Sequence, residues 1–201
     1  MTTEAPGPSE ILRPLEIDMP MRAAAIVLLC AAAAGVVSAQ SRSGGSRRAE
    51  TYDSATVDAS GSLLIIRTGG RRVRIPKQGE QTTFDSPAVS PDKTAVGAQA
   101  MYPNGTSYDI PLQLVVYSGG RVHRFKGTGL PIFQWDFADE GRRVAYGQEP
   151  VHFGCAIHYE LRDIASERLI DQIDVPEPCG ENPHPAPVKV PEWVSRLASK
   201  K

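Results

Sequence analysis

The histidines and cysteines most able to perform chemistry lie near one another in the C-terminal third of the sequence. Imidazole nitrogens and cysteine thiolates are common ligands of zinc and copper. Positions 152–158 read HFGCAIH, and Cys179 lies further along the chain. The candidate metal ligands are His152, His158 and His184. In an extended strand, however, residues 152 and 158 face one side and residue 155 the other. We therefore expect no metal and no cofactor, and interpret the three histidines as surface or packing residues.

Three carboxylates, Asp136, Asp139 and Glu140, are close enough in sequence to suggest acid–base chemistry. They fall on a predicted turn, which Asp favours for local reasons. Glycosidase-type catalysis needs two carboxylates at a set separation across a cleft. The sequence has no G-x-S-x-G elbow, no H-E-x-x-H motif and no phosphate-binding glycine loop. We assign no catalytic residue, and we favour a non-catalytic protein while leaving the question of an enzyme open.

A third candidate is a group of arginines at matching places in two similar segments. The possible basic surface comprises Arg71, Arg72, Arg74, Arg121 and Arg124. If repeated units stack, these side chains form a stripe for an anionic polymer or a membrane surface. The alternative, which we favour, is an ordinary solvated face that acidic residues elsewhere balance.

Charge and composition narrow the classes of protein. The 201 residues include 22 Lys and Arg against 23 Asp and Glu, a formal net charge of −1, which argues against a dedicated nucleic-acid binder. With 41% hydrophobic and 22% charged residues, the chain is neither wholly disordered nor a coiled coil. The 18 glycines and 17 prolines favour many turns and short strands.

An uncharged apolar stretch at residues 23–39 predicts export. Arg22 precedes it, and it ends in Val37-Ser38-Ala39, small or compact residues suited to signal peptidase. We predict a signal peptide over residues 21–39, cleaved after Ala39, and a periplasmic or secreted protein. The alternative is an uncleaved membrane anchor formed by residues 23–39.

The segments on either side of this stretch are expected to lie outside the fold. Residues 1–20 contain four acidic residues and one arginine, whereas a signal peptide begins with positive charge. We interpret them as an over-extended start, with translation beginning at Met21, or as a disordered tail. Residues 40–54 begin with a Gly/Ser/Arg-rich run and are predicted to be a flexible linker.

The cysteines agree with export. Cys30 lies within the apolar stretch, so cleavage leaves Cys155 and Cys179, an even number. In an oxidising compartment such a pair points to a disulfide. The bridge closes a loop of about 25 residues and stabilises the fold by about 3 kcal/mol in the chain-entropy model.

The middle of the chain repeats a β-hairpin pattern. An apolar run at 63–66 is followed by two glycines and an alternating strand at 71–75, and the pattern returns at 113–125. A weaker copy covers 159–170, and a strand–turn–strand unit precedes each copy. A repeat at about 45–50 residues is typical of four-strand propeller blades.

The turn Ser90-Pro91-Asp92-Lys93-Thr94-Ala95-Val96 resembles the S-P-D-G-K-x-I-A turn of TolB-type β-propeller repeats. The segment 161–169 is similar to the outer hairpin of such a blade, and the resemblance covers about residues 55–175. It departs from the pattern where Lys93 replaces the glycine and where Phe137-Ala138-Asp139 replaces Ser-Pro-Asp.

We therefore predict an all-β fold in which residues 55–175 form antiparallel, four-strand, blade-like repeats. At most three blades fit, whereas closed propellers have 4–8, so the propeller would be partial. The alternative is a β-sandwich of short hairpins. Residues 176–201 form a proline-rich tail with a short helix at its end, since proline removes ladder donors and suits a first helical turn.

Two functions remain open. The first is a small exported binding or scaffolding module of the cell envelope, without catalysis, whose partner is an unknown protein or envelope component. For this module we expect no nucleic-acid partner, and contact with the membrane only through an uncleaved signal anchor. Self-assembly is a further possibility. The second is a secreted hydrolase or metal-dependent enzyme. For the enzyme, several of His123, His152, His158, Asp136 and Asp139 should converge in one pocket.

Overall fold

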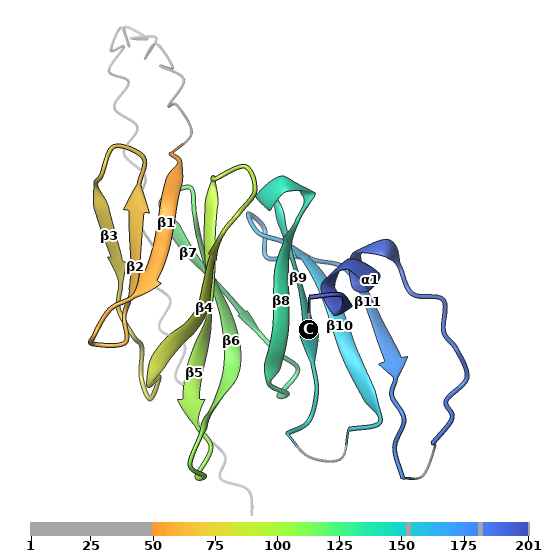
Figure 1. Cartoon of the computed structure of the whole chain (residues 1–201). Helices are drawn as coiled ribbons and strands as arrows, with labels where there is room; N and C mark the ends of the chain where they lie inside the picture. The colour runs from red at the N-terminus through yellow and green to blue at the C-terminus, as the bar shows by residue number, and fades with distance from the viewer. Residues whose placement is uncertain (1–49, 152–153, 181–182, 201) are drawn as a thin grey trace, which may run out of the picture. The chain divides into compact units, whose positions relative to one another are not determined.

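The strands of this protein form three antiparallel sheets in the computed structural model, which describes residues 50–151, 154–180 and 183–200 (Figure 1). Sheet 1 has the order β1-β2-β3, made of β1 (Tyr52–Val57), β2 (Leu63–Arg67) and β3 (Arg72–Ile75). Sheet 2 has the order β4-β5-β6-β7, made of β4 (Thr83–Val89), β5 (Ala95–Pro103), β6 (Asp109–Ser118) and β7 (Arg121–Lys126). Sheet 3 has the order β8-β9-β10-β11, made of β8 (Ile132–Ala138), β9 (Arg143–Gln148), β10 (Ala156–Asp163) and β11 (Leu169–Pro176).

The predicted all-β class is confirmed. Each strand pairs with the next one along the chain, so every sheet is a meander. Sheets 2 and 3 have the four strands predicted for a blade-like repeat, and sheet 1 has three. The predicted signal peptide, the extension before it and the linker as far as residue 49 lie outside the described residues.

Paired glycines explain why the hairpins fold where they do. Gly69 and Gly70 join β2 to β3 with φ of 94° and 82°, and Gly119 and Gly120 join β6 to β7 with φ of 58° and 78°. Two successive residues at positive φ match the right-handed twist of the flanking strands, and only glycine adopts this conformation without steric cost. The resulting register places Leu63 opposite Ile75 in sheet 1.

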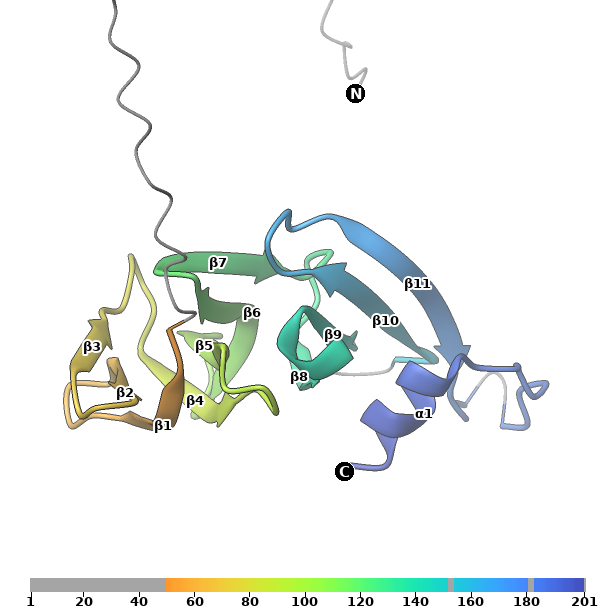
Figure 2. The same cartoon turned by 90° about the horizontal axis from the view of Figure 1, so that it is seen from above.

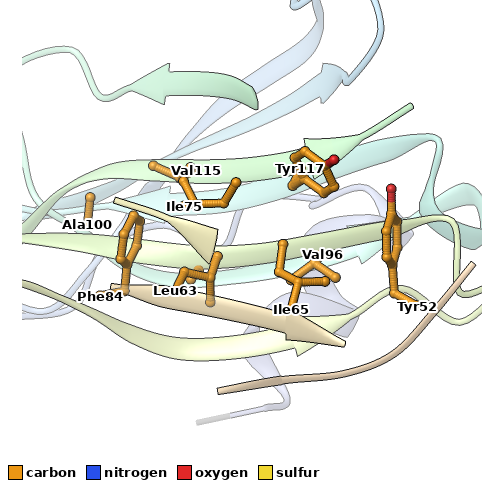
Figure 3. Packing of buried hydrophobic residues seen from close by; sticks show 10 residues of the cluster. Tyr52, Leu63, Ile65, Ile75, Phe84, Val96, Ala100, Val115 and Tyr117 are labelled. Atoms are coloured by element: carbon orange, nitrogen blue, oxygen red, sulfur yellow. The ribbon is translucent and has the colours of Figure 1, made fainter. Parts of the chain in front are cut away.

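Seen from above, the three sheets lie side by side, with sheet 2 between sheets 1 and 3 (Figure 2). An apolar cluster fills the space between sheets 1 and 2, and Figure 3 shows its side chains pointing toward one another from both sheets. Its fully buried members include Leu63 and Ile65 from β2 and Val96 and Val115 from sheet 2. A second cluster, which includes Phe137, joins sheet 2 to sheet 3.

Helix α1 (Glu192–Ala198) covers the far side of sheet 3. Val194 and Leu197 from the helix are buried against Ile157 and other residues of that sheet. Trp193 is partly buried there, and its Nε1 donates to Asp171 Oδ2 at 3.0 Å. The stack therefore ends in a helical layer rather than in an open sheet face.

The turns between the first two strands of sheets 2 and 3 also pack together. Asp92 Oδ1 accepts hydrogen bonds from Ser90 Oγ at 2.7 Å and from the Thr94 amide at 3.0 Å. Lys93, the next residue, has a φ of 62°, in the left-handed region that favours glycine. The Asp92 amide donates to Glu140 O at 3.4 Å, so the turn contacts its counterpart in sheet 3.

The predicted disulfide is confirmed. It joins Cys155 and Cys179, whose Cα atoms lie 5.3 Å apart. Beside it, the Glu177 amide donates to Cys155 O at 2.8 Å. The bridge therefore ties the tail that follows β11 to the start of β10. Within the described part of the chain, no helix is long and apolar enough to cross a membrane.

Removing the bridge tests its contribution to stability. In the Cys155→Ala/Cys179→Ala variant, the unfolded chain loses a constraint spanning 24 residues. We expect the free energy of unfolding to fall by about 3 kcal/mol, measured by urea denaturation under oxidising conditions. Adding reductant should lower the stability of the natural protein and leave the variant unchanged. A loss below about 1 kcal/mol would contradict this account.

Candidate functional site

A groove of about 380 Å³ lies between sheets 2 and 3 and is named here the inter-sheet groove. Its walls come from the turns and strand ends of both sheets. The lining residues are Thr94, Ser118, Gly119, Arg121, His123, Gly141, Arg142, Asp163, Ile164 and Ala165. Small and aliphatic residues therefore form much of the surface, and charged side chains stand around it.

The backbone fixes the positions of the charged residues. The Gly119–Gly120 turn makes Arg121 the first residue of β7. On the opposite wall, the Ile164 amide donates to Arg142 O at 3.0 Å and joins the end of β10 to the start of β9. Ile164 itself is buried in the cluster between the two sheets. Both arginines are thus presented by rigid turns at the rim of an apolar floor.

The groove carries excess positive charge. Arg121 and Arg142 are exposed, and neither takes part in an ion pair with another described residue. The nearby carboxylate of Asp163 accepts hydrogen bonds from Ser166 Oγ at 2.7 Å and from the Ser166 amide at 2.9 Å. These two bonds hold the pKa of Asp163 below its usual value. Asp163 is therefore ionised, but its carboxylate is hydrogen-bonded to Ser166 in its own turn.

His123 contributes to the wall of the groove from β7. It is buried, and its Nδ1 lies 3.1 Å from Glu167 Oε1 in the connection between β10 and β11. This contact joins the outer strand of sheet 2 to sheet 3. Its geometry indicates a role in holding the two walls together.

A buried carboxylate, Glu160, lies on the face of β10 that looks toward sheet 2. Tyr146 Oη donates to Glu160 Oε2 at 2.7 Å, and Arg162 Nε donates to the same oxygen at 2.6 Å. Gln148 Nε2 donates to the other oxygen at 3.1 Å. Burial pushes the pKa of Glu160 upward, but the three donors outweigh it and hold the pKa below the usual 4.5. The carboxylate is charged and fully engaged.

His158 is placed between two carboxylates. Its Nδ1 lies 2.6 Å from Asp174 Oδ1, and its Nε2 lies 3.3 Å from Glu160 Oε1. Such a pair resembles a base with its orienting acid, but Nε2 is buried and makes no hydrogen bond to a described residue. A substrate therefore cannot reach the nitrogen that would transfer the proton, and the arrangement serves to join β10 to β11.

The other candidate ligands and acids are dispersed. His152 lies outside the described residues, His184 is exposed in the tail, and Cys155 is consumed by the disulfide. Asp136 Oδ2 lies 2.8 Å from Lys200 Nζ near α1. No group of three or more His, Cys, Asp or Glu side chains suited to a metal ion occurs within residues 50–151, 154–180 and 183–200.

Two of the suggested acid–base carboxylates belong to the turn before β9. Asp139 Oδ2 pairs with Arg143 Nη1 at 3.0 Å. Glu140 has a φ of 58° inside a short 3₁₀ turn, η1 (Asp139–Gly141). Neither side chain lines the inter-sheet groove.

The five arginines of the suggested basic surface occupy different layers. Arg71, just before β3, and Arg72, the first residue of β3, are both exposed. Arg74 is also exposed, and its Nε lies 3.0 Å from Asp58 Oδ2. Arg121 lines the inter-sheet groove, whereas Arg124 is half-buried on the face of sheet 2 that looks toward sheet 1.

Arg142 and the residues around Glu160 are not among the candidate site residues predicted from the sequence. A signal for the second group existed, since His158, Glu160 and Arg162 alternate with apolar residues and so share one face of a strand. Alternation ordinarily indicates a face in water. Here the neighbouring sheet covers that face, which the sequence does not show.

Replacing Glu160 by glutamine tests the buried network. The change removes the negative charge that faces Arg162, so we expect the free energy of unfolding at pH 7 to fall by about 2 kcal/mol. Because the folded-state pKa of Glu160 lies below its unfolded value near 4.5, its contribution is complete above that pH and is lost as the pH falls through the folded pKa.

The difference in free energy of unfolding between the natural protein and the Glu160→Gln variant should therefore stay constant from pH 7 to about pH 5. It should shrink at lower pH. Urea denaturation over this pH range measures it. Glu80→Gln, at an exposed loop position, is the matched control and should leave the stability nearly unchanged. A difference that grows on acidification would show that the assigned direction is wrong.

Comparison with known proteins gives no family. No protein family matches the sequence, and no curated protein is significantly similar to it. Among solved structures, hydrazine synthase of Kuenenia stuttgartiensis matches with a TM-score of 0.38 and 14% identity, over 64% of this chain and 35% of that chain. Acylaminoacyl peptidase of Pyrococcus horikoshii matches with a TM-score of 0.38 and 13% identity, over 63% of this chain and 25% of that one. The chain thus spans about a third or less of each matched structure.

Proposed function

We propose that this protein is an exported, non-catalytic binding module of the cell envelope that holds an acidic, partly apolar segment of a partner in the inter-sheet groove. The observation that carries the proposal is the composition of that groove. Arg121 and Arg142 stand exposed over a floor of glycine, alanine and isoleucine, and neither pairs with a described carboxylate. An apolar floor between cations suits a ligand with alternating apolar and acidic groups.

The competing function, a secreted hydrolase or metal-dependent enzyme, requires acids and bases that converge. The described candidates lie at four separate places, and each pairs with a different side chain. The pairs are His123 with Glu167, His158 with Asp174, Asp136 with Lys200, and Asp139 with Arg143. Each is committed to a structural contact. This distribution favours the binding module.

Export is supported by two independent features. The Cys155–Cys179 bridge suits an oxidising compartment. The uncharged stretch at 23–39, with Arg22 before it, has the pattern of a signal peptide. We propose a periplasmic or secreted location, with membrane anchoring through residues 23–39 as the alternative.

We further propose that the fold is a partial propeller related to TolB-type repeats. The Asp92 turn and the glycine hairpins support this relationship. Self-assembly through the far face of sheet 3 is disfavoured, because α1 covers that face. Binding therefore concerns the grooves between the sheets or the other end of the stack.

The mature N-terminus tests the proposed export. Mass spectrometry of the protein recovered from its native host should find Gln40 as the first residue, since cleavage is expected after Ala39. The cytosolic fraction of a strain with blocked secretion is the control and should retain residues 21–39. Recovery of any peptide from residues 1–20 would overturn the proposed start at Met21.

Charge reversal in the groove tests the proposed binding. The probe is a fluorescein-labelled peptide of alternating leucine and glutamate, and its lysine counterpart is the negative control. The Arg121→Glu/Arg142→Glu variant should weaken binding of the acidic peptide at least about tenfold in fluorescence anisotropy, because two attractive charges become repulsive.

The matched variant is Arg71→Glu/Arg72→Glu, which makes the same change of charge on exposed residues of sheet 1. It should keep the affinity within about twofold, after allowance for the long-range field. Equal binding of the acidic and basic peptides, or equal losses in the two double variants, would refute the groove as the binding site.

A further inference from the structure

His123 uses only one of its two ring nitrogens in the contact that joins the walls of the inter-sheet groove. Its Nδ1 lies 3.1 Å from Glu167 Oε1. Its Nε2 makes no hydrogen bond to a described residue and is not fully buried, in contrast with Nε2 of His158. Of the His123 side chain, 10% is exposed, and the residue lines the groove. The imidazole therefore presents a free ring nitrogen to the groove.

Glu167 sets the position of the hydrogen on the neutral imidazole. An ionised carboxylate only accepts hydrogen bonds, so the Nδ1 that faces it carries the hydrogen. In the neutral ring Nε2 is then a bare acceptor. After protonation Nε2 also carries a hydrogen and becomes a donor. The nitrogen that faces the groove thus changes from an acceptor, which repels a ligand carboxylate, to a charged donor, which binds one.

Arg121 lies beside this nitrogen on the same wall of the groove. Arg121 and His123 are two residues apart in β7 and therefore share one face of the strand. In the register of β6 and β7 they are opposite Ser118 and Val116. Arg121 is exposed and takes part in no ion pair with another described residue. A carboxylate at His123 Nε2 would therefore also lie in the field of the Arg121 guanidinium.

Fixed charges of both signs surround the imidazole. They are Arg121 from β7, Glu167 from the β10–β11 connection, and Arg142, Glu160, Arg162 and Asp163 from sheet 3 and its turns. The carboxylate of Asp163 is hydrogen-bonded to Ser166. That of Glu160 accepts from Arg162 Nε at 2.6 Å. Among these described carboxylates only Glu167 contacts the imidazole, so the Nε2 side is open to a carboxylate from a ligand.

We propose that His123 is a carboxylate-binding residue of the inter-sheet groove and that it takes up a proton from solvent when the acidic ligand binds. The ligand carboxylate accepts a hydrogen bond from Nε2 of the imidazolium, while Glu167 holds the ring from the other side through Nδ1. Binding and protonation favour each other by the same factor, because the two equilibria are linked. This inference rests on the proposed function, since it concerns the same groove and the same acidic ligand.

The pH dependence of binding tests this role. The probe is a capped, unlabelled peptide of alternating leucine and glutamate, titrated calorimetrically at pH 8 and pH 6 at constant ionic strength. The natural protein should bind it about fivefold to tenfold more tightly at pH 6, because histidine gains a proton in this interval while glutamate stays ionised. His123→Gln gains no proton and should bind with nearly equal affinity at both pH values. His184→Gln, in the exposed tail, is the matched control and should keep the full gain.

Proton uptake gives a readout that a purely structural role would not change. At pH 7, calorimetry in buffers of different ionisation enthalpy should show that the natural protein takes up about half a proton per bound peptide, and His123→Gln about none. Glu167→Gln, at an exposed position, removes the charge that favours the imidazolium and should reduce the gain at pH 6 to about half or less. It provides a second variant if His123→Gln fails to fold.

The possible outcomes separate this inference from the proposed function. Equally tight binding at pH 8 and pH 6 by the natural protein would overturn the role of His123 and leave the groove as the binding site. An undiminished gain in His123→Gln, or an equal loss of the gain in His184→Gln, would have the same meaning. Absence of peptide binding at either pH would overturn the proposed function and this inference with it.

Discussion

The burial of sheet 2 on both of its faces is the constraint on which the rest of the structure depends. Its strand β5 is buried along Ala95–Ala100, so side chains on both faces of that strand are removed from water. A strand in this position needs small residues where the neighbouring sheet comes close. At Gly97 an added Cβ would lie 2.5 Å from Trp135 Cη2, which means that the indole ring from sheet 3 packs directly on the backbone of β5. The absence of a side chain at Gly97 makes room for this ring in the close-packed space between the two sheets.

Stacking of the sheets also determines whether a polar side chain is exposed or buried, because equivalent positions in the repeats have different neighbours. Arg74 at one end of the stack finds water and Asp58, whereas Arg124 lies between two sheets without a carboxylate of its own. Glu160, between sheets 2 and 3, is surrounded by donors. A low-dielectric environment strengthens a satisfied group and penalises an unsatisfied one. The space between sheets 2 and 3 thus holds a satisfied network, and the space between sheets 1 and 2 holds an unsatisfied cation.

The far side of sheet 3 is closed by a different device. Repeat stacks need a terminal layer whose outer surface is polar, since a bare sheet would expose its apolar face. Here α1 supplies Val194 and Leu197 to that face, and the Cys155–Cys179 bridge ties the tail before the helix back to β10. The proline-rich segment between them cannot form a strand and so cannot extend the sheet.

The sequence by itself determined the local units of this protein. The glycine pairs at 69–70 and 119–120 set the hairpins because glycine accepts two successive positive φ angles without steric cost. The even cysteine count after the apolar stretch led to the Cys155–Cys179 bridge, and alternation along the strands gave the all-β class. These are short-range consequences of residue type and spacing.

The tertiary structure alone decided which of those units face one another. It brought Arg121 and Arg142 to one groove, although they belong to different sheets, and it buried the terminal nitrogens of Arg124 but left Arg74 exposed. Among the described residues, sheet 1 contains three strands and sheets 2 and 3 contain four each. The physical reason is that strand alternation distinguishes two faces but does not say which neighbour, or whether water, covers each of them.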